Sequence, residues 1–430
     1  MIEHNLDPES LMMTYGYKPE LSEGAIKCPI FQTSTFVFKT AEEGKAFFEL
    51  AYGLREKSPK EELGLIYSRI NNPNLEILEN RLCLWDKADD CAIFESGMSA
   101  ISTVLLEFLK PGDLLIYSNP LYGGTDHFIQ HFLNKIGVHT IGVMPDQSIE
   151  EVEEMIKVSG KADKLAMIYL ETPANPTNHI VDIEKFSQLA SKYGTAEKKS
   201  LLVVDNTYMG PLWQHPLQCG ADLVVYSATK YIGGHSDLIA GAVLGNSELM
   251  IRVKTLRTFL GNMVSPHTAW LLLRSLETLK VRMDKQTQNA QIVAAYLGNH
   301  PKVKKVYYLG LLKKGMDGYD VYTKQCSAPG AMVSFDIIGG EKEAFCFLNN
   351  LKLMKLAVSL GGTESLAQHP KTMTHAGVDE SQRKQMNVTD QLVRLSIGVE
   401  STKDLIWDLE QSLKKVKVSE LKTEIGVSGL

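Results

Sequence analysis

The stretch LVVYSATKY, residues 223–231, says more about fold and chemistry than any other part of the chain. The apolar run Leu223–Val225 indicates a buried strand, and it leads into two hydroxyl side chains that flank an alanine and are followed by Lys230. A lysine amine that is held in place and partly desolvated can form a Schiff base with an aldehyde, and neighbouring hydroxyls suit a phosphate ester. A surface lysine at a strand end is the alternative, so the rest of the chain has to decide.

The preceding apolar run, Leu201–Val204, ends in Asp205 and indicates a strand buried on both faces of a parallel sheet. Open α/β sheets bind their ligands at the carboxyl ends of such strands. An anion beside the ring nitrogen of pyridoxal phosphate keeps that ring protonated and therefore a strong electron sink. A helix-capping or turn aspartate is the ordinary alternative. Because Asp205 and Lys230 close successive hydrophobic strands, the two runs together predict a pyridoxal phosphate site.

Further motifs make the chain resemble the Cys/Met-metabolism enzymes, the γ-family of fold-type I pyridoxal phosphate enzymes. The motifs follow in order between about residues 14 and 412, at 67–69, 96–98, 121–125, 171–176, 205–207, 227–230, 359–362 and 394–398. The resemblance implies an α/β protein with the fold-type I PLP-dependent transferase fold. This is a doubly wound, mostly parallel sheet with a smaller C-terminal α/β domain.

The hydrophobic pattern agrees with that fold and predicts three parts. Strand-length apolar runs alternate with helical segments at 114–117, 138–143, 165–170, 201–204 and 223–226. Helical sequence over 266–297 then leads to strand-like runs at 331–337, 356–360 and 393–397. We expect an N-terminal arm over 1–70 that contributes to a neighbouring subunit, a large cofactor-binding domain over 71–265 and a C-terminal domain over 266–430. A charged stretch at 53–64 is an insertion relative to the family pattern.

Composition limits the classes of function. The chain has 430 residues, 44% of them hydrophobic, a net charge of −6 and a pI of about 6.0, without a long basic patch, so nucleic acid is not an expected partner. It has no uncharged apolar stretch long enough to cross a membrane, and its N-terminus lacks the features of a signal peptide. Six scattered cysteines without a C-x-x-C pair indicate reduced thiols in the cytoplasm and no metal site.

The phosphate of the cofactor has several candidate ligands. Ser96, Gly97 and Met98 precede a helical segment, and a helix N-terminus offers free N–H groups to a phosphate, although a Ser-Gly at this place is more often a simple cap. The resemblance implies backbone contacts at Gly97 and Met98. It adds side-chain contacts around the cofactor from Thr207, Ser227 and Thr229.

Tyr67 and Arg69 complete the phosphate site by resemblance, and in the family they come from a neighbouring subunit. That implies at least an obligate dimer, and the family is typically a dimer of dimers. Arginine suits this role because it binds phosphate through two charge-assisted hydrogen bonds. A surface arginine in a turn is the alternative.

The resemblance also assigns the residues around the ring and the substrate. Tyr122 is expected to stack on the pyridine ring and to act as an acid toward the leaving group, and Asn175 to contact the phenolic oxygen of the cofactor. The guanidinium of Arg394 has paired N–H donors suited to the α-carboxylate of the substrate, and Ser359 is expected to contact the same carboxylate. Thr374 is a further candidate on the substrate side.

The choice of reaction depends on the substrate tail. Val358 stands where members that handle cystathionine carry a glutamate, and an apolar wall suits an uncharged thioether. Against this, Gly124 stands where methionine γ-lyases carry a cysteine. We therefore expect a lyase of sulfur amino acids that acts by α,γ-elimination on L-methionine or related homocysteine or homoserine derivatives. The alternatives are a cystathionine γ-lyase, a cystathionine γ-synthase or an O-acetylhomoserine sulfhydrylase.

A protein that has this fold but no catalytic activity, such as a scaffold or cofactor carrier, is a hypothesis from another class. It predicts the loss of Lys230, Asp205 or Arg394, and the chain retains all three.

Overall fold

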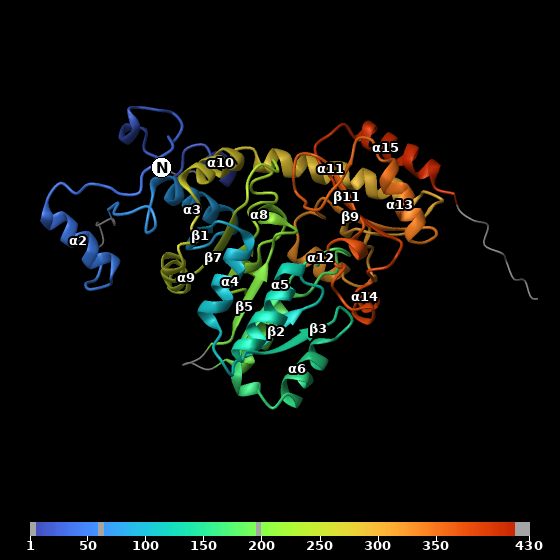
Figure 1. The fold of residues 1–430 in the computed structure, drawn as a ribbon, viewed down its shortest axis with the longest axis horizontal. Helices are drawn as coiled ribbons and strands as arrows, with labels where there is room; N and C mark the ends of the chain where they lie inside the picture. Colours follow the sequence, from blue (N-terminus) through green and yellow to red (C-terminus); the bar gives the residue numbers. More distant parts are fainter. Residues whose placement is uncertain (1–5, 59–63, 195–198, 418–430) are drawn as a thin grey trace, which may run out of the picture.

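A computed structural model describes residues 6–58, 64–194 and 199–417 of the chain (Figure 1). Part of the predicted charged insertion, residues 59–63, and the last 13 residues of the predicted C-terminal domain, 418–430, lie outside the described residues. No helix among the described residues is long and apolar enough to cross a membrane.

A seven-stranded sheet forms the centre of the larger part, with the strand order β1-β7-β6-β5-β4-β2-β3. Strands β2 to β6 run parallel to one another, whereas β7 is antiparallel to both β1 and β6. Their bounds are β1 Asp90–Phe94, β2 Leu114–Ser118, β3 His139–Val143, β4 Leu165–Glu171, β5 Leu201–Asp205, β6 Leu223–Tyr226 and β7 Gly241–Gly245. The prediction of a doubly wound, mostly parallel sheet is confirmed.

Strand β5 shows why these sequences form a sheet covered on both faces. Successive side chains of a strand point to opposite faces. Leu201 and Val203 accordingly belong to one apolar cluster, together with residues of α4 (Gly97–Phe108) and α9 (Ser247–Leu260). Leu202 and Val204 belong to another, with residues of α6 (Ile149–Val158) and α7 (Ile183–Tyr193). A continuous apolar run is therefore required, because both faces of β5 are buried.

The remaining helices of the larger part are α3 (Pro73–Asp86), α5 (Gly123–Phe128), α8 (Gly210–Trp213) and α10 (Pro266–Leu276). Helix α3 begins after Asn72, whose side-chain oxygen accepts a hydrogen bond from the backbone N–H of Asn74, and Pro73 occupies its first position. It ends at Lys87, which has a left-handed backbone conformation with φ +54°.

A second sheet, of five strands in the order β10-β11-β12-β9-β8, forms the smaller C-terminal part. The long helix α11 (Leu279–Gly298) reaches it from the larger part (Figure 1). The strands are β8 Val303–Tyr307, β9 Met332–Ile337, β10 Lys355–Leu356, β11 Leu366–Gln368 and β12 Leu392–Ser396. Helices α12 (Tyr319–Gln325), α13 (Glu341–Asn350), α14 (Glu380–Gln385) and α15 (Thr402–Lys415) complete this part.

The strand predicted over 356–360 is wrong beyond its first residue, because β10 ends at Leu356. Ser359 has φ +97°, a left-handed conformation that does not continue a strand. The chain turns there toward the larger part, and Ser359 reaches the side chain of Lys230.

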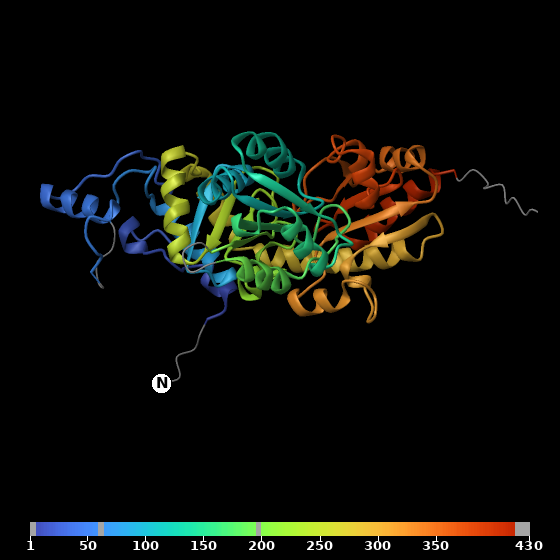
Figure 2. The ribbon, with the colours of Figure 1, turned by 90° about the horizontal axis from the view of Figure 1, so that it is seen from below.

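The N-terminal segment extends away from the body of the protein, at the end opposite the second sheet (Figures 1 and 2). It contains the short helix α1 (Pro8–Leu11) and, farther out, α2 (Ala41–Ala51). Several of its large apolar side chains are strongly exposed, namely Leu21, Ile26, Val37, Tyr52 and Leu54.

Candidate active site

A cavity of about 260 Å³ lies at the carboxyl ends of β4, β5 and β6. This is where open parallel sheets bind ligands. Most of the predicted cofactor residues line it, although they come from distant parts of the sequence: Ser96, Gly97, Met98, Tyr122, Asn175, Asp205, Thr207, Ser227, Thr229 and Lys230. Glu171, Tyr208, Ile239 and Leu360 also line it and were not among the predicted site residues.

Lys230 lies four residues after the end of β6, and its side chain points to the C-terminal part. Its Nζ donates a hydrogen bond to the Ser359 hydroxyl at 2.9 Å. Burial and, to a smaller extent, the positive charge of Arg394 together lower the pKa of the Lys230 ammonium to about 8. The amine is therefore easier to deprotonate than an ordinary lysine, as a nucleophile and proton acceptor requires.

Asp205, the last residue of β5, is buried at the bottom of the cavity. One carboxylate oxygen accepts a hydrogen bond from the Thr207 backbone N–H at 3.0 Å, and the other accepts one from the Tyr169 hydroxyl at 3.3 Å. Burial raises the pKa of Asp205 while these hydrogen bonds oppose the shift. A cation next to Asp205 would restore its ionised form, which fits the protonated nitrogen of a pyridine ring.

Glu171, the last residue of β4, pairs in register with Asp205 on the neighbouring strand. Its carboxylate accepts hydrogen bonds from the backbone N–H of Tyr122 at 2.6 Å and of Asn175 at 3.3 Å. Burial, together with the charge of Asp205, raises the pKa of Glu171 to about 8. Glu171 therefore holds the backbones of two predicted cofactor contacts in place.

The N-terminus of α4 forms another wall of the cavity. Ser96 caps the helix, since its hydroxyl accepts a hydrogen bond from the Ser99 N–H at 3.0 Å. A Cβ added at Gly97 would lie 2.8 Å from the Cβ of Ser227, so only glycine allows the helix end to approach β6 this closely. The N–H groups at the start of α4 and the Ser227 hydroxyl are donors that suit a phosphate.

The two threonines predicted to contact the cofactor have structural partners. The Thr229 hydroxyl donates to the Ala240 carbonyl at 3.1 Å and accepts from the Ala240 N–H at 3.0 Å. The Thr207 hydroxyl accepts from the Ser227 N–H at 2.8 Å. Both side chains therefore fix the loop that carries Ser227 and Lys230.

Arg394 on β12 is buried between the two parts of the protein. Its guanidinium donates to the side-chain oxygen of Asn175 at 3.0 Å and to the backbone carbonyl of Ser359 at 2.6 Å. These two bonds fix the planar fork beside the cavity, an arrangement that suits bidentate recognition of a carboxylate.

Six predicted residues do not line the cavity: Tyr67, Arg69, Val358, Ser359, Thr374 and Arg394, although Ser359 and Arg394 lie beside it, in contact with Lys230 and Asn175 respectively. Arg69 donates to the carbonyl of Thr258 at 3.0 Å, and its guanidinium lies 5.7 Å from the centre of the Tyr67 ring. Val358 is 57% exposed in the single chain. The Thr374 hydroxyl instead contacts Gln368 and His375, at 3.1 and 2.9 Å.

The residues of the cavity fit pyridoxal phosphate. A lysine of lowered pKa, a buried acid, a helix N-terminus and an arginine fork are the groups that its aldehyde, ring nitrogen, phosphate and amino acid substrate need. Because Gly97 has no side chain, the start of α4 approaches Ser227 closely and leaves its N–H groups open to a phosphate.

The comparisons with known proteins agree with this geometry. Residues 9–414 match the family described as Cys/Met metabolism PLP-dependent enzyme, and the chain belongs to this family. L-methionine gamma-lyase from Fusobacterium nucleatum subsp. nucleatum is 41% identical over 395 residues, which cover 91% of this chain and 94% of that protein. Cystathionine gamma-lyase from Homo sapiens is 39% identical over 366 residues, or 85% of this chain and 87% of that protein.

A solved structure of cystathionine gamma synthase from Xanthomonas oryzae pv. oryzae is also similar. It superposes with a TM-score of 0.84 at 33% identity and covers 96% of this chain and 99% of that one. The fold-type I fold, the pyridoxal phosphate cofactor and the enzymatic nature of the protein, as predicted from the sequence, are therefore confirmed.

Proposed function

We propose that this enzyme catalyses the α,γ-elimination of L-methionine, or of a related homocysteine or homoserine derivative. Methionine and water would give 2-oxobutanoate, ammonia and methanethiol. The observation that carries the proposal is the partly buried hydrogen bond between Lys230 and Ser359 beside the Arg394 guanidinium, in a chain whose relatives include L-methionine gamma-lyases. Bound pyridoxal phosphate supplies the electron sink that stabilises a carbanion at the substrate's Cα.

Each side chain then has one task. Arg394 holds the α-carboxylate and so orients the Cα–H bond toward Lys230. Lys230 accepts that proton, because its lowered pKa lets the neutral amine exist near neutral pH. Tyr122 lines the cavity and is half exposed, and its phenol would protonate the departing sulfur.

A γ-replacement enzyme, such as a cystathionine γ-synthase or an O-acetylhomoserine sulfhydrylase, is the second candidate, together with a cystathionine γ-lyase. Gly124 favours these alternatives. A Cβ at this position would lie 2.6 Å from Cε1 of Tyr122, so the cysteine of the methionine γ-lyase pattern would require the tyrosine ring to move.

One assay separates the candidates. The purified enzyme is incubated separately with methionine, cystathionine, cysteine and O-acetylhomoserine, with and without an added thiol, and 2-oxobutanoate, pyruvate and ammonia are measured. Release of 2-oxobutanoate and ammonia from methionine, as the preferred substrate, supports the proposal. A preference for cystathionine, or an absolute need for the thiol, supports an alternative.

Val358→Glu is expected to shift specificity toward cystathionine. If Val358 faces the γ-substituent once the site is complete, a carboxylate opposite a methylthio group loses its hydration without a partner, at a cost of ~1–3 kcal/mol. The distal ammonium of cystathionine would instead pair with it. The ratio of kcat/KM for cystathionine to that for methionine should rise about tenfold or more. An unchanged ratio would show that Val358 does not contact the substrate.

We also propose that the enzyme is a homo-oligomer, a dimer of dimers, in which Tyr67 and Arg69 complete the phosphate site of a neighbouring subunit. Their position outside the cavity of their own chain supports this, as do the extended arm and its exposed apolar side chains.

We further propose a cytoplasmic location for the enzyme, because its six cysteines are free thiols.

Arg69→Ala should weaken cofactor retention, because a charge-assisted hydrogen bond contributes ~1.5–3 kcal/mol. Mixing this variant with Lys230→Ala should restore partial activity, since a hybrid site can take Arg69 from one chain and Lys230 from the other. Activity is measured after subunit exchange has been demonstrated with tagged chains. No recovery in exchanged oligomers would place both residues in a site built from one chain.

A further inference from the structure

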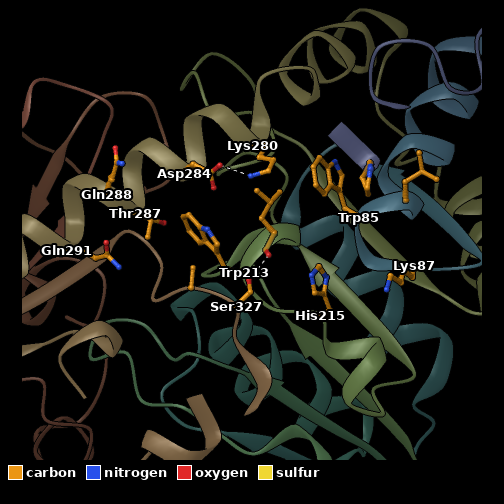
Figure 3. Close-up of a pocket in the computed structure, with 14 residues that line it drawn as sticks. Trp85, Lys87, Trp213, His215, Lys280, Asp284, Thr287, Gln288, Gln291 and Ser327 are labelled. Atoms are coloured by element: carbon orange, nitrogen blue, oxygen red, sulfur yellow. Dashed lines mark hydrogen bonds and ion pairs between the residues drawn. The ribbon is translucent and has the colours of Figure 1, made fainter. Parts of the chain in front are cut away.

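A second cavity, of about 430 Å³, lies between the end of α3, helix α8 and the first half of α11 (Figure 3). It shares no lining residue with the cofactor cavity. Its volume falls in the range of roughly 300–1,000 Å³ that small-molecule sites occupy. Nothing in the proposed reaction uses it.

One part of the wall of this cavity is aromatic and aliphatic, and the rest is polar. Trp85 from α3 and Trp213 from α8 both line it and are almost completely buried, with Leu84 and Leu212 beside them. Trp213 is fixed by an edge-to-face contact with Tyr231, in which the ring centroids lie 5.1 Å apart. Two rigid indoles provide a surface that suits a flat apolar ligand.

The charged side chains that line the cavity leave one positive charge without an opposite charge among them. Lys280 and Asp284 form an ion pair at 2.7 Å and offset each other. Burial, aided by the charge of Lys87, lowers the pKa of His215, which keeps this imidazole neutral. The ammonium of Lys87 forms no hydrogen bond or ion pair with any residue that the structure describes. An anion is therefore the ligand that complements the cavity.

Unpartnered polar atoms belong to the same set of residues. Within the described part of the chain, the indole N–H of Trp85 and the Thr287 hydroxyl are both buried without a hydrogen-bond partner. His215 Nδ1 is likewise buried without a hydrogen-bond partner, since it lies 4.0 Å from the Asp86 carboxylate. A buried polar group without a partner costs free energy, and a bound polar group can recover that cost.

We propose that this cavity is a second ligand site, separate from the active site, for a small carboxylate with a flat apolar body. The Lys87 ammonium pairs with the carboxylate, and the indoles of Trp85 and Trp213 contact the body. The Trp85 N–H and the Thr287 hydroxyl supply hydrogen bonds.

Calorimetric titration of the holoenzyme with indole-3-acetate tests this site. We expect saturable binding of one ligand per chain, and at least tenfold weaker binding of indole-3-acetamide, which has the same shape without the charge. Lys87→Asn should also weaken binding of the acetate at least tenfold. Asparagine is the appropriate replacement because it tolerates the left-handed conformation at this position.

Two further variants complete the test. Ser327 is exposed at the cavity, so Ser327→Phe should fill the space and abolish binding without disturbing the core. Lys314→Asn removes an exposed lysine that lines neither cavity and should leave the affinity unchanged. The proposal is overturned if indole-3-acetate does not bind at millimolar concentration. It is overturned equally if binding is unaffected by both Lys87→Asn and Ser327→Phe, because the ligand then binds elsewhere.

Discussion

Lys230→Ala is expected to reduce turnover by at least about a thousandfold, to the limit of detection. The substitution removes the amine that binds the cofactor covalently and the group that accepts the Cα proton. General acid–base catalysis alone contributes ~10²–10⁴-fold, and the loss of the covalent link adds to this. Turnover of the preferred substrate is measured with saturating pyridoxal phosphate, so that weaker cofactor binding does not account for the loss.

The same variant should still fold, because Lys230 makes one side-chain hydrogen bond, to Ser359, and its removal leaves the apolar clusters intact. Circular dichroism and thermal unfolding check this. Borohydride should fix the cofactor to the wild type and not to the variant. If Lys230→Ala kept a tenth of wild-type turnover, the catalytic lysine would have to be another residue.

The parallel core of the fold was predictable because its strands are buried on both faces. The runs at Leu201–Val204 and Leu223–Tyr226 are continuous and apolar, and each became a strand. Strands β1 and β7 were not predicted. β7 begins and ends in glycine and is only five residues long, so its pattern in the sequence is weak. Its partners β1 and β6 decide its conformation, and such pairings are not local in the sequence.

The residues of the candidate site were predictable where an ionisable side chain follows an apolar run that forms a strand. Asp205 and Lys230 both follow apolar runs, and they line one cavity. Glu171 follows the run Leu165–Leu170 in the same way, so the reasoning that selected Asp205 also applies to it. Its role was missed because its partners, two backbone N–H groups from separate loops, appear only in the folded chain.

Arg69 and Val358 were predicted from the family resemblance, and the single subunit does not show the contacts proposed for them. Arg69 has a partner within its own chain, the Thr258 carbonyl, and its proposed phosphate contact requires a neighbour. Val358 is exposed in the isolated chain, and only a complete site would enclose it. The subunit-mixing experiment tests the proposed role of Arg69, and the specificity ratio tests that of Val358.

Asp205→Asn is expected to leave the cofactor bound and to lower kcat by about a thousandfold. An ion pair at ~4 Å contributes ~4 kcal/mol at an effective dielectric constant near 20, and each 1.36 kcal/mol corresponds to about tenfold in rate. An amide cannot hold a proton on the ring nitrogen, so the ring stabilises the carbanion less. The measurements are kcat under saturating substrate and the visible absorption spectrum of the bound cofactor.

Glu171→Gln is the matched control, because it neutralises the neighbouring buried acid in register with Asp205. The pKa of Glu171 is already raised to about 8, so this residue is largely protonated near neutral pH and its charge contributes less. We therefore expect a much smaller loss of kcat than for Asp205→Asn, with the spectrum of the cofactor retained. Near-normal turnover of Asp205→Asn together with a severe loss in Glu171→Gln would move the partner of the ring nitrogen to Glu171.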